Sequence, residues 1–236
     1  MASTPDIHYV VNFIEKIQKP PQQDSFMDGM KYIFNYVRTL PSFMLGQLHE
    51  NIDPQGRFPF VNLVAFSNSD FHVFRPGTPP AEWVTVAATG VGPVGTQTVY
   101  PGGYKEIATT MGEVMATKPP KDDSSCYLLL PFKDTVVGEV NSGAFESDWK
   151  AKSGTTILSE SCSGDVKLGD FALYKRILTG RSPYLYMLRC EVQLGSTKEQ
   201  VRALIPTLRE KLSANGIPFD DIGAYSVCHL NYPKKE

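Results

Sequence analysis

The sequence has few cysteines, and none lie in an arrangement that binds metal. Its 236 residues contain four cysteines, all in the second half, and no two of them are spaced like zinc ligands or a redox pair. Cys126, Cys190 and Cys228 lie within apolar runs, where a free thiol behaves as a small hydrophobic side chain, whereas Cys162 does not. We therefore expect buried, structural cysteines and no metal centre.

Long apolar runs, a surplus of one charge and the common nucleotide-binding motifs are also missing. No apolar stretch approaches the ~20 residues that span a bilayer. The 23 basic and 25 acidic residues leave a net charge of −2, which gives no electrostatic reason to expect nucleic acid or an acidic membrane as a partner. The first residues have no basic patch and no apolar core, so we expect no signal peptide. The sequence contains no P-loop, dinucleotide-binding glycine fingerprint or nucleophile elbow. We expect a soluble, cytoplasmic protein.

Chain length and one polar segment predict two domains. Typical domains have roughly 100–150 residues, so a chain of 236 residues suits two of them. Residues 116–125 are polar and contain two prolines, a composition typical of a linker. We predict a first domain over residues 6–115 and a second over residues 126–233.

The first half is predicted to have the β-α-β-β-α-β order of a ferredoxin-like domain. Runs of β-branched and aromatic residues predict strands at 7–17, 43–52, 58–66 and 100–110. A helix is predicted from the cap residue Ser25 to Leu40, because apolar residues recur on one helical face between them. A short second helix is predicted at 68–74. Residues 76–99, rich in glycine, proline and threonine, are interpreted as a long loop.

The second half is predicted to repeat this order without a close sequence repeat. Strands are predicted at 126–132, 156–162, 170–178, 182–194 and 224–232. A short helix is predicted at 144–152. A longer helix begins at a capping box of Ser196 and Glu199 and ends before Gly216.

Three segments of the first half resemble a known family. Residues 40–53 (LPSFMLGQLHENID) look like a helix end, a strand and a turn of that family. Residues 57–71 (RFPFVNLVAFSNSDF) are similar to the strand and helix start that follow, although the family often has tryptophan in place of Phe66. Residues 100–106 (YPGGYKE) resemble its last strand. Over roughly residues 6–110 the chain thus resembles antibiotic-biosynthesis-monooxygenase (ABM) domains of the dimeric α+β barrel superfamily.

The resemblance implies an α+β fold in which two sheets pack face to face, usually across a homodimer. Each sheet has one face covered by its own helices, and its other face would expose a large apolar patch if it were left bare. Two such units in one chain can cover each other. We therefore predict tandem ferredoxin-like domains with antiparallel sheets that form a dimeric α+β barrel-like pseudo-dimer. A further homodimer stays open.

Polar residues on otherwise apolar strands are the candidate catalytic residues. Strand alternation places Asn12, His49 and Asn62 each on a strand face with apolar neighbours. If all three point away from the helices, they meet in the barrel interior. The other place for a site is a pocket between sheet and helices. His72, on the predicted short helix, is the fourth candidate. Candidate substrate contacts are Phe60, Phe66, Trp83 and Tyr104, of which Trp83 lies in the long loop and could cover a pocket.

Three functions remain open. The resemblance implies a cofactor-independent monooxygenase acting on a small aromatic molecule. Asn12 and Asn62 would then orient the substrate and stabilise an oxyanion, with His49 or His72 as general base. The alternative is a haem-binding or haem-degrading protein, because related families pair a first-strand asparagine with a histidine, and His72 would be the axial ligand. The third is a non-catalytic barrel that binds a ligand or partner, since a fold does not fix a function.

Overall fold

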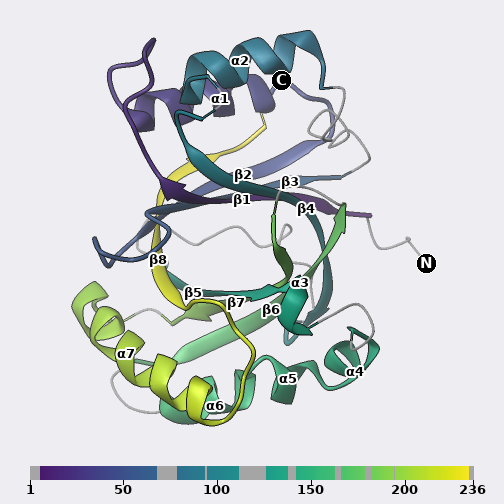
Figure 1. The fold of residues 1–236 in the computed structure, drawn as a ribbon, viewed down its shortest axis with the longest axis vertical. Helices are drawn as coiled ribbons and strands as arrows, with labels where there is room; N and C mark the ends of the chain where they lie inside the picture. Colours follow the sequence, from purple (N-terminus) through teal and green to yellow (C-terminus); the bar gives the residue numbers. More distant parts are fainter. Residues whose placement is uncertain are drawn as a thin grey trace.

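Eight antiparallel strands form a closed barrel. The computed structural model describes residues 6–67, 79–93, 95–111, 126–137, 142–162, 166–178, 182–193 and 195–233. Helices lie outside the barrel, with those of residues 26–37 and 81–91 on one side and those of residues 142–214 on the other (Figure 1). The predicted α+β class is confirmed. Among the described residues, no helix has the length and apolar character needed to cross a membrane.

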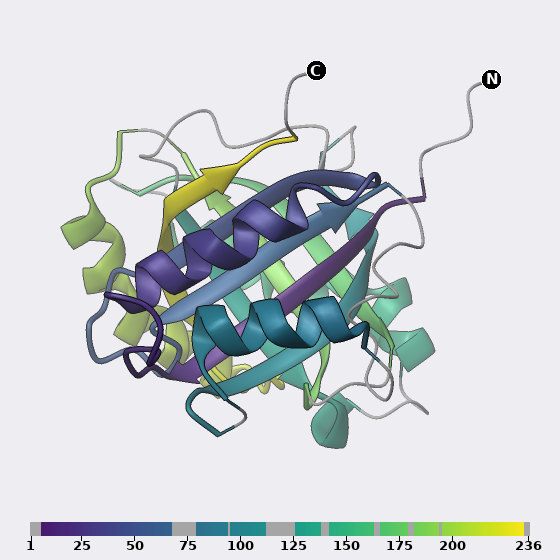
Figure 2. The same cartoon turned by 90° about the horizontal axis from the view of Figure 1, so that it is seen from above.

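The first half has the ferredoxin-like element order that the sequence predicts. It contains β1 (His8–Lys16), α1 (Phe26–Val37), β2 (Phe43–Asn51), β3 (Phe60–Phe66), α2 (Ala81–Val91) and β4 (Thr98–Thr109). Its strands are neighbours in the order β4-β1-β3-β2. Figure 2 shows α1 and α2 lying side by side across the outer face of this sheet.

The second half repeats the strand arrangement with a more divided first helical segment. It contains β5 (Cys126–Lys133), α3 (Asp134–Val137), α4 (Ser142–Ser147), α5 (Trp149–Lys152), α6 (Thr155–Ser161), β6 (Leu168–Leu178), β7 (Tyr184–Val192), α7 (Lys198–Ala214) and β8 (Gly223–Asn231). Its strands are neighbours in the order β8-β5-β7-β6, which corresponds strand for strand to the order β4-β1-β3-β2 of the first half.

Two strand pairs join the halves. β2 pairs with β8, and β4 pairs with β6. Each junction therefore joins the second strand of one half to the fourth strand of the other, as a two-fold axis between two subunits would do. The predicted pseudo-dimer is confirmed, and each sheet covers the inner face of the other (Figure 1).

Three cores follow from this layering. One core fills the barrel interior and is rich in aromatic residues, among them Tyr9, Phe13, Tyr174 and Tyr184. A second lies between the first sheet and its helices, and a third between the second sheet and its helices. Bulky side chains occupy most of the interior, so the two sheets share one core.

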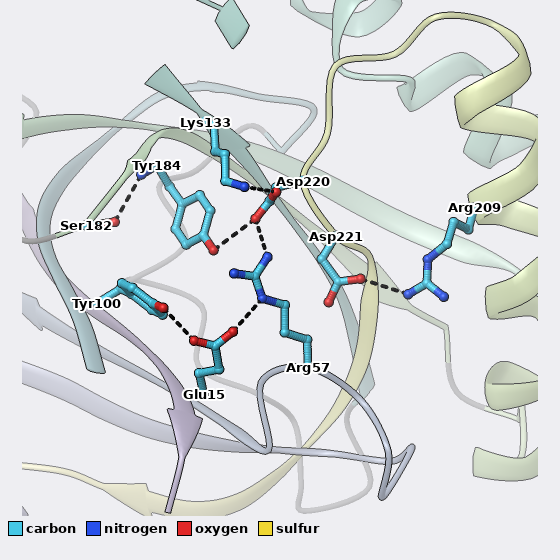
Figure 3. A network of polar contacts seen from close by, with 9 residues as sticks. All are labelled: Glu15, Arg57, Tyr100, Lys133, Ser182, Tyr184, Arg209, Asp220 and Asp221. Atoms are coloured by element: carbon cyan, nitrogen blue, oxygen red, sulfur yellow. Dashed lines mark hydrogen bonds and ion pairs between the residues drawn. The ribbon is translucent and has the colours of Figure 1, made fainter. Parts of the chain in front are cut away.

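A polar network lies at one end of the barrel, where strands of both halves begin or end (Figure 3). Arg57, in the β2–β3 connection, donates from Nε to Glu15 at 2.8 Å and from Nη1 to Asp220 at 2.6 Å. Asp220 also accepts from the hydroxyl of Tyr184 at 3.1 Å and pairs with Lys133. This network ties the first half to the second.

Most predicted elements of the first half are confirmed, with one correction. The Ser25 side chain caps α1 by accepting from the backbone N–H of Asp28 at 3.1 Å. The segment 76–99, interpreted as a loop, contains the second helix, α2. The alanines and valines of α2 lie among threonines and a glycine, which have low helix propensity. This composition made the segment resemble a loop. The helix predicted at 68–74 and the linker predicted at 116–125 lie outside the described residues.

The second half differs from the prediction at two places. Residues 156–162, predicted as a strand, belong to the helix α6. Its buried residues Thr155 and Leu158 are three apart, a helical spacing that the β-branched residues obscured. The capping box of α7 uses Thr197 and Gln200, one residue after the predicted pair. Gly216 follows α7 with a φ of 69°, a left-handed conformation that suits glycine.

Candidate functional site

A cavity of about 420 Å³ lies between the outer face of the first sheet and the helices α1 and α2. Strands β1, β3 and β4 contribute one wall, and the two helices contribute the other. Most lining side chains are apolar: Val10, Ile14, Met30, Ile33, Phe34, Val37, Val64, Val84, Val91, Val99 and Leu178 are among them. Cavities of this size and composition are typical of small-molecule sites.

Two asparagines form a polar spot on the sheet side of the cavity. Asn12 of β1 and Asn62 of β3 are directly opposite each other in the antiparallel pair. Opposed residues point to the same face of a sheet, and both asparagines line the cavity. Val10 and Val64, two residues further along, are also opposed and also line it. The cavity floor thus presents two neighbouring amides within an apolar surface.

Asn62 has unused hydrogen-bonding capacity. Its side chain is 5% exposed, and its Oδ1 is buried without a hydrogen-bond partner. Such a group costs about 1–3 kcal/mol relative to one that is paired or in water. Asn12 is half-buried, and its side chain makes no hydrogen bond within the described part of the chain. A ligand with a hydroxyl or amino group would supply the donor that Asn62 lacks.

The helix α2 forms the roof of the cavity. Trp83, Ala87 and Val91 recur every four residues, so they share one helix face, and all three line the cavity. The Trp83 ring contacts the ring of Tyr36 on α1, with centroids 6.0 Å apart. Ala87 and its neighbour Ala88 are small, and this leaves room below the helix.

Two glycines set the crossing of α1 and α2. A Cβ atom added at Gly29 would lie 1.8 Å from the carbonyl oxygen of Gly90, and one added at Gly90 would lie 2.5 Å from Ile33. The helix backbones therefore touch at this end of the roof. At the other end, the rings of Tyr36 and Trp83 lie between the helices. The close crossing fixes how high α2 lies above the sheet.

The Gln97 side chain closes one edge of the cavity. Its Nε2 donates to the carbonyl of Gln18 at 2.7 Å and to that of Val91, the last residue of α2, at 3.1 Å. Its Oε1 accepts from the backbone N–H of Gln18 at 2.9 Å. Because these bonds satisfy both ends of the amide, Gln97 is a structural part of the wall.

Three of the residues predicted for the site meet at this cavity. They are Asn12, Asn62 and Trp83. Phe60 and Phe66 lie on the same face of β3 but are buried in the adjoining core. There Phe60 packs on Phe26 with ring centroids 5.0 Å apart, and Phe66 packs on Phe43 at 6.2 Å. His72 lies outside the described residues.

His49 and Tyr104 point into the barrel interior instead. His49 is fully buried, and its Nδ1 donates to the carbonyl of Val61 at 3.1 Å. Burial and the nearby charge of Arg189 lower the pKa of His49 to about 3, so it is neutral near pH 7. The Tyr104 hydroxyl donates to the carbonyl of Tyr184 at 2.9 Å, and burial raises its pKa to about 12.

Asn12, His49 and Asn62 do not all point away from the helices, which is the condition under which they would meet in the barrel interior. Asn12 and Asn62 face the helices, whereas His49 faces the interior. The first sheet therefore separates His49 from the two asparagines, and in this conformation His49 does not reach a ligand in the cavity. Alternation along a strand shows which residues share a face, but it does not show which face the helices cover.

Sequence reasoning missed the part of the wall that β4 contributes. Pro101, Gly102 and Gly103 line the cavity, and Pro101 is opposite Asn12 in the register with β1. A Pro-Gly-Gly run inside a strand was the available signal, because glycine in a strand often marks a place where a ligand or another backbone approaches. The glycines present backbone without side chains to the ligand space.

The fold places this protein in the class of dimeric α+β barrels, here with both sheets supplied by one chain. The chain belongs to a family described as a domain of unknown function, DUF7153, whose profile matches residues 43–220. No curated protein matches the sequence.

Solved structures show the same architecture at low sequence identity. The chain is similar to an anthrone oxidase-like protein, with 12% identity over 98% of this chain and 94% of that chain and a TM-score of 0.59. A proposed monooxygenase from Lactobacillus acidophilus NCFM has 14% identity over 96% of both chains and a TM-score of 0.47. A mutant chlorite dismutase from Candidatus Nitrospira defluvii has 13% identity over 94% of this chain and 91% of that chain, with a TM-score of 0.44. At 12% identity, the similarity to the anthrone oxidase-like protein establishes a shared fold and no more.

Proposed function

We propose that the cavity under α1 and α2 binds a small aromatic molecule with a hydroxyl group, and that the protein oxidises this molecule with dioxygen as a cofactor-independent monooxygenase. The observation that carries the proposal is the unpartnered, buried Oδ1 of Asn62 on the floor of an otherwise apolar cavity. An apolar cavity selects a flat apolar ligand, and a few convergent polar groups fix its orientation.

The asparagine pair suits a substrate that becomes an anion. The Oδ1 of Asn62 accepts a hydrogen bond from the substrate hydroxyl and holds the ring in place. The neighbouring Asn12 amide donates to the oxygen on which negative charge develops when the substrate loses a proton. Amide groups fixed on two adjacent strands need little rearrangement during the reaction, and this favours the charged intermediate.

The reaction that fits this site needs only the substrate and dioxygen. The substrate loses a proton to form a stabilised carbanion, which reduces dioxygen. One oxygen atom becomes a new carbonyl on the substrate, and the other leaves as water with two substrate hydrogens. The described lining residues contain no acidic or histidine side chain that could take the first proton. His72, predicted from the sequence as a base, therefore stays a proposal.

The similarity to an anthrone oxidase-like protein supports a tricyclic phenol as the first compound to try. The two proteins share the fold, and the support is limited to that. A cavity of about 420 Å³ lies within the range of roughly 300–1,000 Å³ that holds drug-sized ligands.

Haem is the second ligand that the sequence predicts, and the described residues do not fit it. Haem iron needs an axial ligand such as histidine, cysteine, tyrosine or methionine. Among the described residues that line the cavity, Met30 alone is of these types, and it is packed in the core beneath α1 with 3% exposure. A haemin titration checks this: we expect no Soret shift, whereas a shift that is lost in His72→Ala would favour haem.

Oxygen consumption tests the proposed activity. Purified protein, without added metal or flavin, should consume dioxygen in the presence of anthrone. Asn62→Ala should lower the rate at least tenfold, because the substrate loses the hydrogen bond that holds its ring in place. Asn35→Ala is the matched control, because Asn35 is exposed on α1 and lines no cavity. Equal rates in wild type and Asn62→Ala would contradict the proposed role, and lack of anthrone binding would contradict the substrate class.

A further inference from the structure

The barrel interior contains an arginine that the fold and the cavity leave unexplained. Arg189 of β7 is 1% exposed and pairs with Leu129 and Ala172, two residues of the interior core. Its Nη2 donates to Oε1 of Gln47 on β2 at 3.0 Å, so the side chain reaches from the second sheet to the first. Its guanidinium carbon lies 3.8 Å from the ring centroid of Tyr127.

Polar atoms without partners gather around this contact. Of seven buried side-chain N and O atoms that lack a hydrogen bond among the described residues, four belong here: Nε and Nη1 of Arg189, Nε2 of Gln47 and Nε2 of His49. Gln47 and His49 are two residues apart on β2 and are 1% and 0% exposed. The ring of His49 lies 5.6 Å from that of Tyr127, the residue that Arg189 covers. Three side chains thus bring their unpaired atoms to one region.

The positive charge of Arg189 has no carboxylate beside it. A guanidinium remains protonated in proteins, and Arg189 makes no ion pair within the described part of the chain. Glu106 of β4 accepts from the Tyr9 hydroxyl at 3.4 Å and also bonds the hydroxyl of Tyr174. Burial raises the pKa of Tyr174 well above its usual value, so this neighbouring hydroxyl supplies no negative charge. A buried cation without a counter-charge is unfavourable.

We propose that the barrel interior binds a small inorganic monoanion, chloride or bicarbonate, between Arg189 and Gln47. Nε2 of Gln47 and one unpaired donor of Arg189, either Nε or Nη1, donate to the anion. The N–H groups of Nε and Nη1 point to opposite sides of the planar guanidinium, so a small anion meets only one of them. His49 donates from Nδ1 to Val61, so its Nε2 is an acceptor. The hydroxyl of bicarbonate, or a water that accompanies chloride, donates to this Nε2.

An anion fits this place better than water alone. Water could complete the hydrogen bonds, but it would leave the charge of Arg189 uncompensated in a packed interior. The ligand would be held by one side chain from each half, so it would stabilise the closure of the barrel. The site is independent of the proposed oxidation, because it lies on the opposite face of the first sheet from the cavity.

Thermal unfolding at constant ionic strength tests the proposal with the intact protein. The reference salt is gluconate, an anion too large for the interior. In one titration chloride replaces gluconate step by step, and in a second titration bicarbonate replaces it. A bound anion raises the melting temperature by roughly 3–6 °C when its concentration reaches ten times its dissociation constant. The titration that produces the rise identifies the anion. The same melting temperature in all three salts would overturn the proposal.

Substitutions test whether the dependence of the melting temperature on the anion arises at Arg189. Arg189→Met has a similar length and no charge, and it should lose the dependence on the anion while remaining folded in gluconate. Arg202→Met is the matched control, because Arg202 is on the surface of α7 with its side chain 54% exposed, and it should keep the dependence. If Arg189→Met does not fold, Gln47→Met tests the same site. It should lower the affinity for the anion about tenfold, because it removes one hydrogen-bond donor. An unchanged dependence in the folded variants would contradict the site.

A crystal grown in bromide gives the direct readout. Bromide replaces chloride and scatters anomalously, so a peak within hydrogen-bonding distance of Nε or Nη1 of Arg189 is expected. Non-anomalous density for a planar four-atom group would identify bicarbonate. Density for water only would overturn the proposal.

Discussion

Nη1 of Arg57 lies 2.6 Å from Oδ2 of Asp220, and this contact joins residues 163 positions apart at one end of the barrel (Figure 3). Arg57 belongs to the first half and Asp220 to the second. Closure of the barrel places Arg57 between Glu15 and Asp220, two carboxylates from different halves. Removing this ion pair therefore tests how much the contact between the two halves contributes to stability.

Replacing Arg57 should weaken this junction measurably. Arg57→Met leaves Asp220, whose side chain is 11% exposed, with one fewer charged donor, so we expect a loss of about 1–3 kcal/mol in the free energy of unfolding. Urea unfolding measures it. Arg202→Met breaks an exposed pair with Asp53 at 3.5 Å and should change stability by less than about 1 kcal/mol. Equal effects would show that the network does not hold the halves together.

The carboxylates of this network predict a loss of stability in acid. A hydrogen bond from Tyr100 lowers the pKa of Glu15. Burial acts to raise the pKa of Asp220, but the hydrogen bond from Lys133 and the charge of Arg57 outweigh it and leave the pKa lowered. A carboxylate with a lowered folded-state pKa stabilises the fold fully above its unfolded pKa, and this is lost as the pH falls through the folded pKa.

The contribution of these carboxylates to the free energy of unfolding should be constant from pH 7 to about pH 5 and decrease below it. It adds to a loss that begins near pH 6.5, because His49, with a folded pKa of about 3, stays neutral while the unfolded imidazole takes up a proton. Asp220→Asn should lower stability at pH 7 and reduce the acid slope. The control is Glu210→Gln, since Glu210 is exposed on α7 and should leave the slope unchanged. A slope that is the same in Asp220→Asn and wild type would show that other carboxylates dominate.

Replacing Asn62 should raise the stability of the ligand-free protein and lower its affinity for the ligand. Asn62→Leu has a similar volume and removes a buried acceptor that has no partner, so the ligand-free protein should gain about 1 kcal/mol, or roughly 2–4 °C in melting temperature. Ligand affinity should fall by tenfold or more. Calorimetric melting and a binding titration measure the two effects. Asn35→Leu, on the exposed face of α1, should change neither, and a destabilised Asn62→Leu would point to a structural role.

Filling the cavity from its roof should abolish binding without unfolding the protein. Ala88→Phe projects a ring from α2 into the space between helix and sheet, so ligand affinity should fall at least tenfold. Thr85→Phe places the same ring on the exposed face of α2 and is the matched control. Binding retained in Ala88→Phe would show that the ligand lies elsewhere.

The order of elements could be predicted from the sequence, but the position of the site could not. Period-two alternation identified β1 to β4 and placed Asn12 and Asn62 among apolar residues. It gave no means of deciding which strand face meets the helices, because both faces of a barrel sheet are buried. The cavity also depends on α2, whose threonines and glycine resemble a loop in composition. A pocket between distant segments requires the packing of α2 against α1, which no local pattern contains.

The contact of Gly29 with Gly90 predicts a coupling between the roof and the site. Gly29→Ala places a Cβ atom 1.8 Å from the Gly90 carbonyl oxygen, a backbone atom that moves only if the helices separate. We expect a loss of about 1–3 kcal/mol in stability and weaker ligand binding, because the roof would rise above the asparagine pair. Gly143→Ala is the control: an added Cβ there meets nothing within 4 Å, so stability should be unchanged or slightly higher. Gly29→Ala with wild-type stability and affinity would show that α2 shifts freely and that its height does not define the cavity.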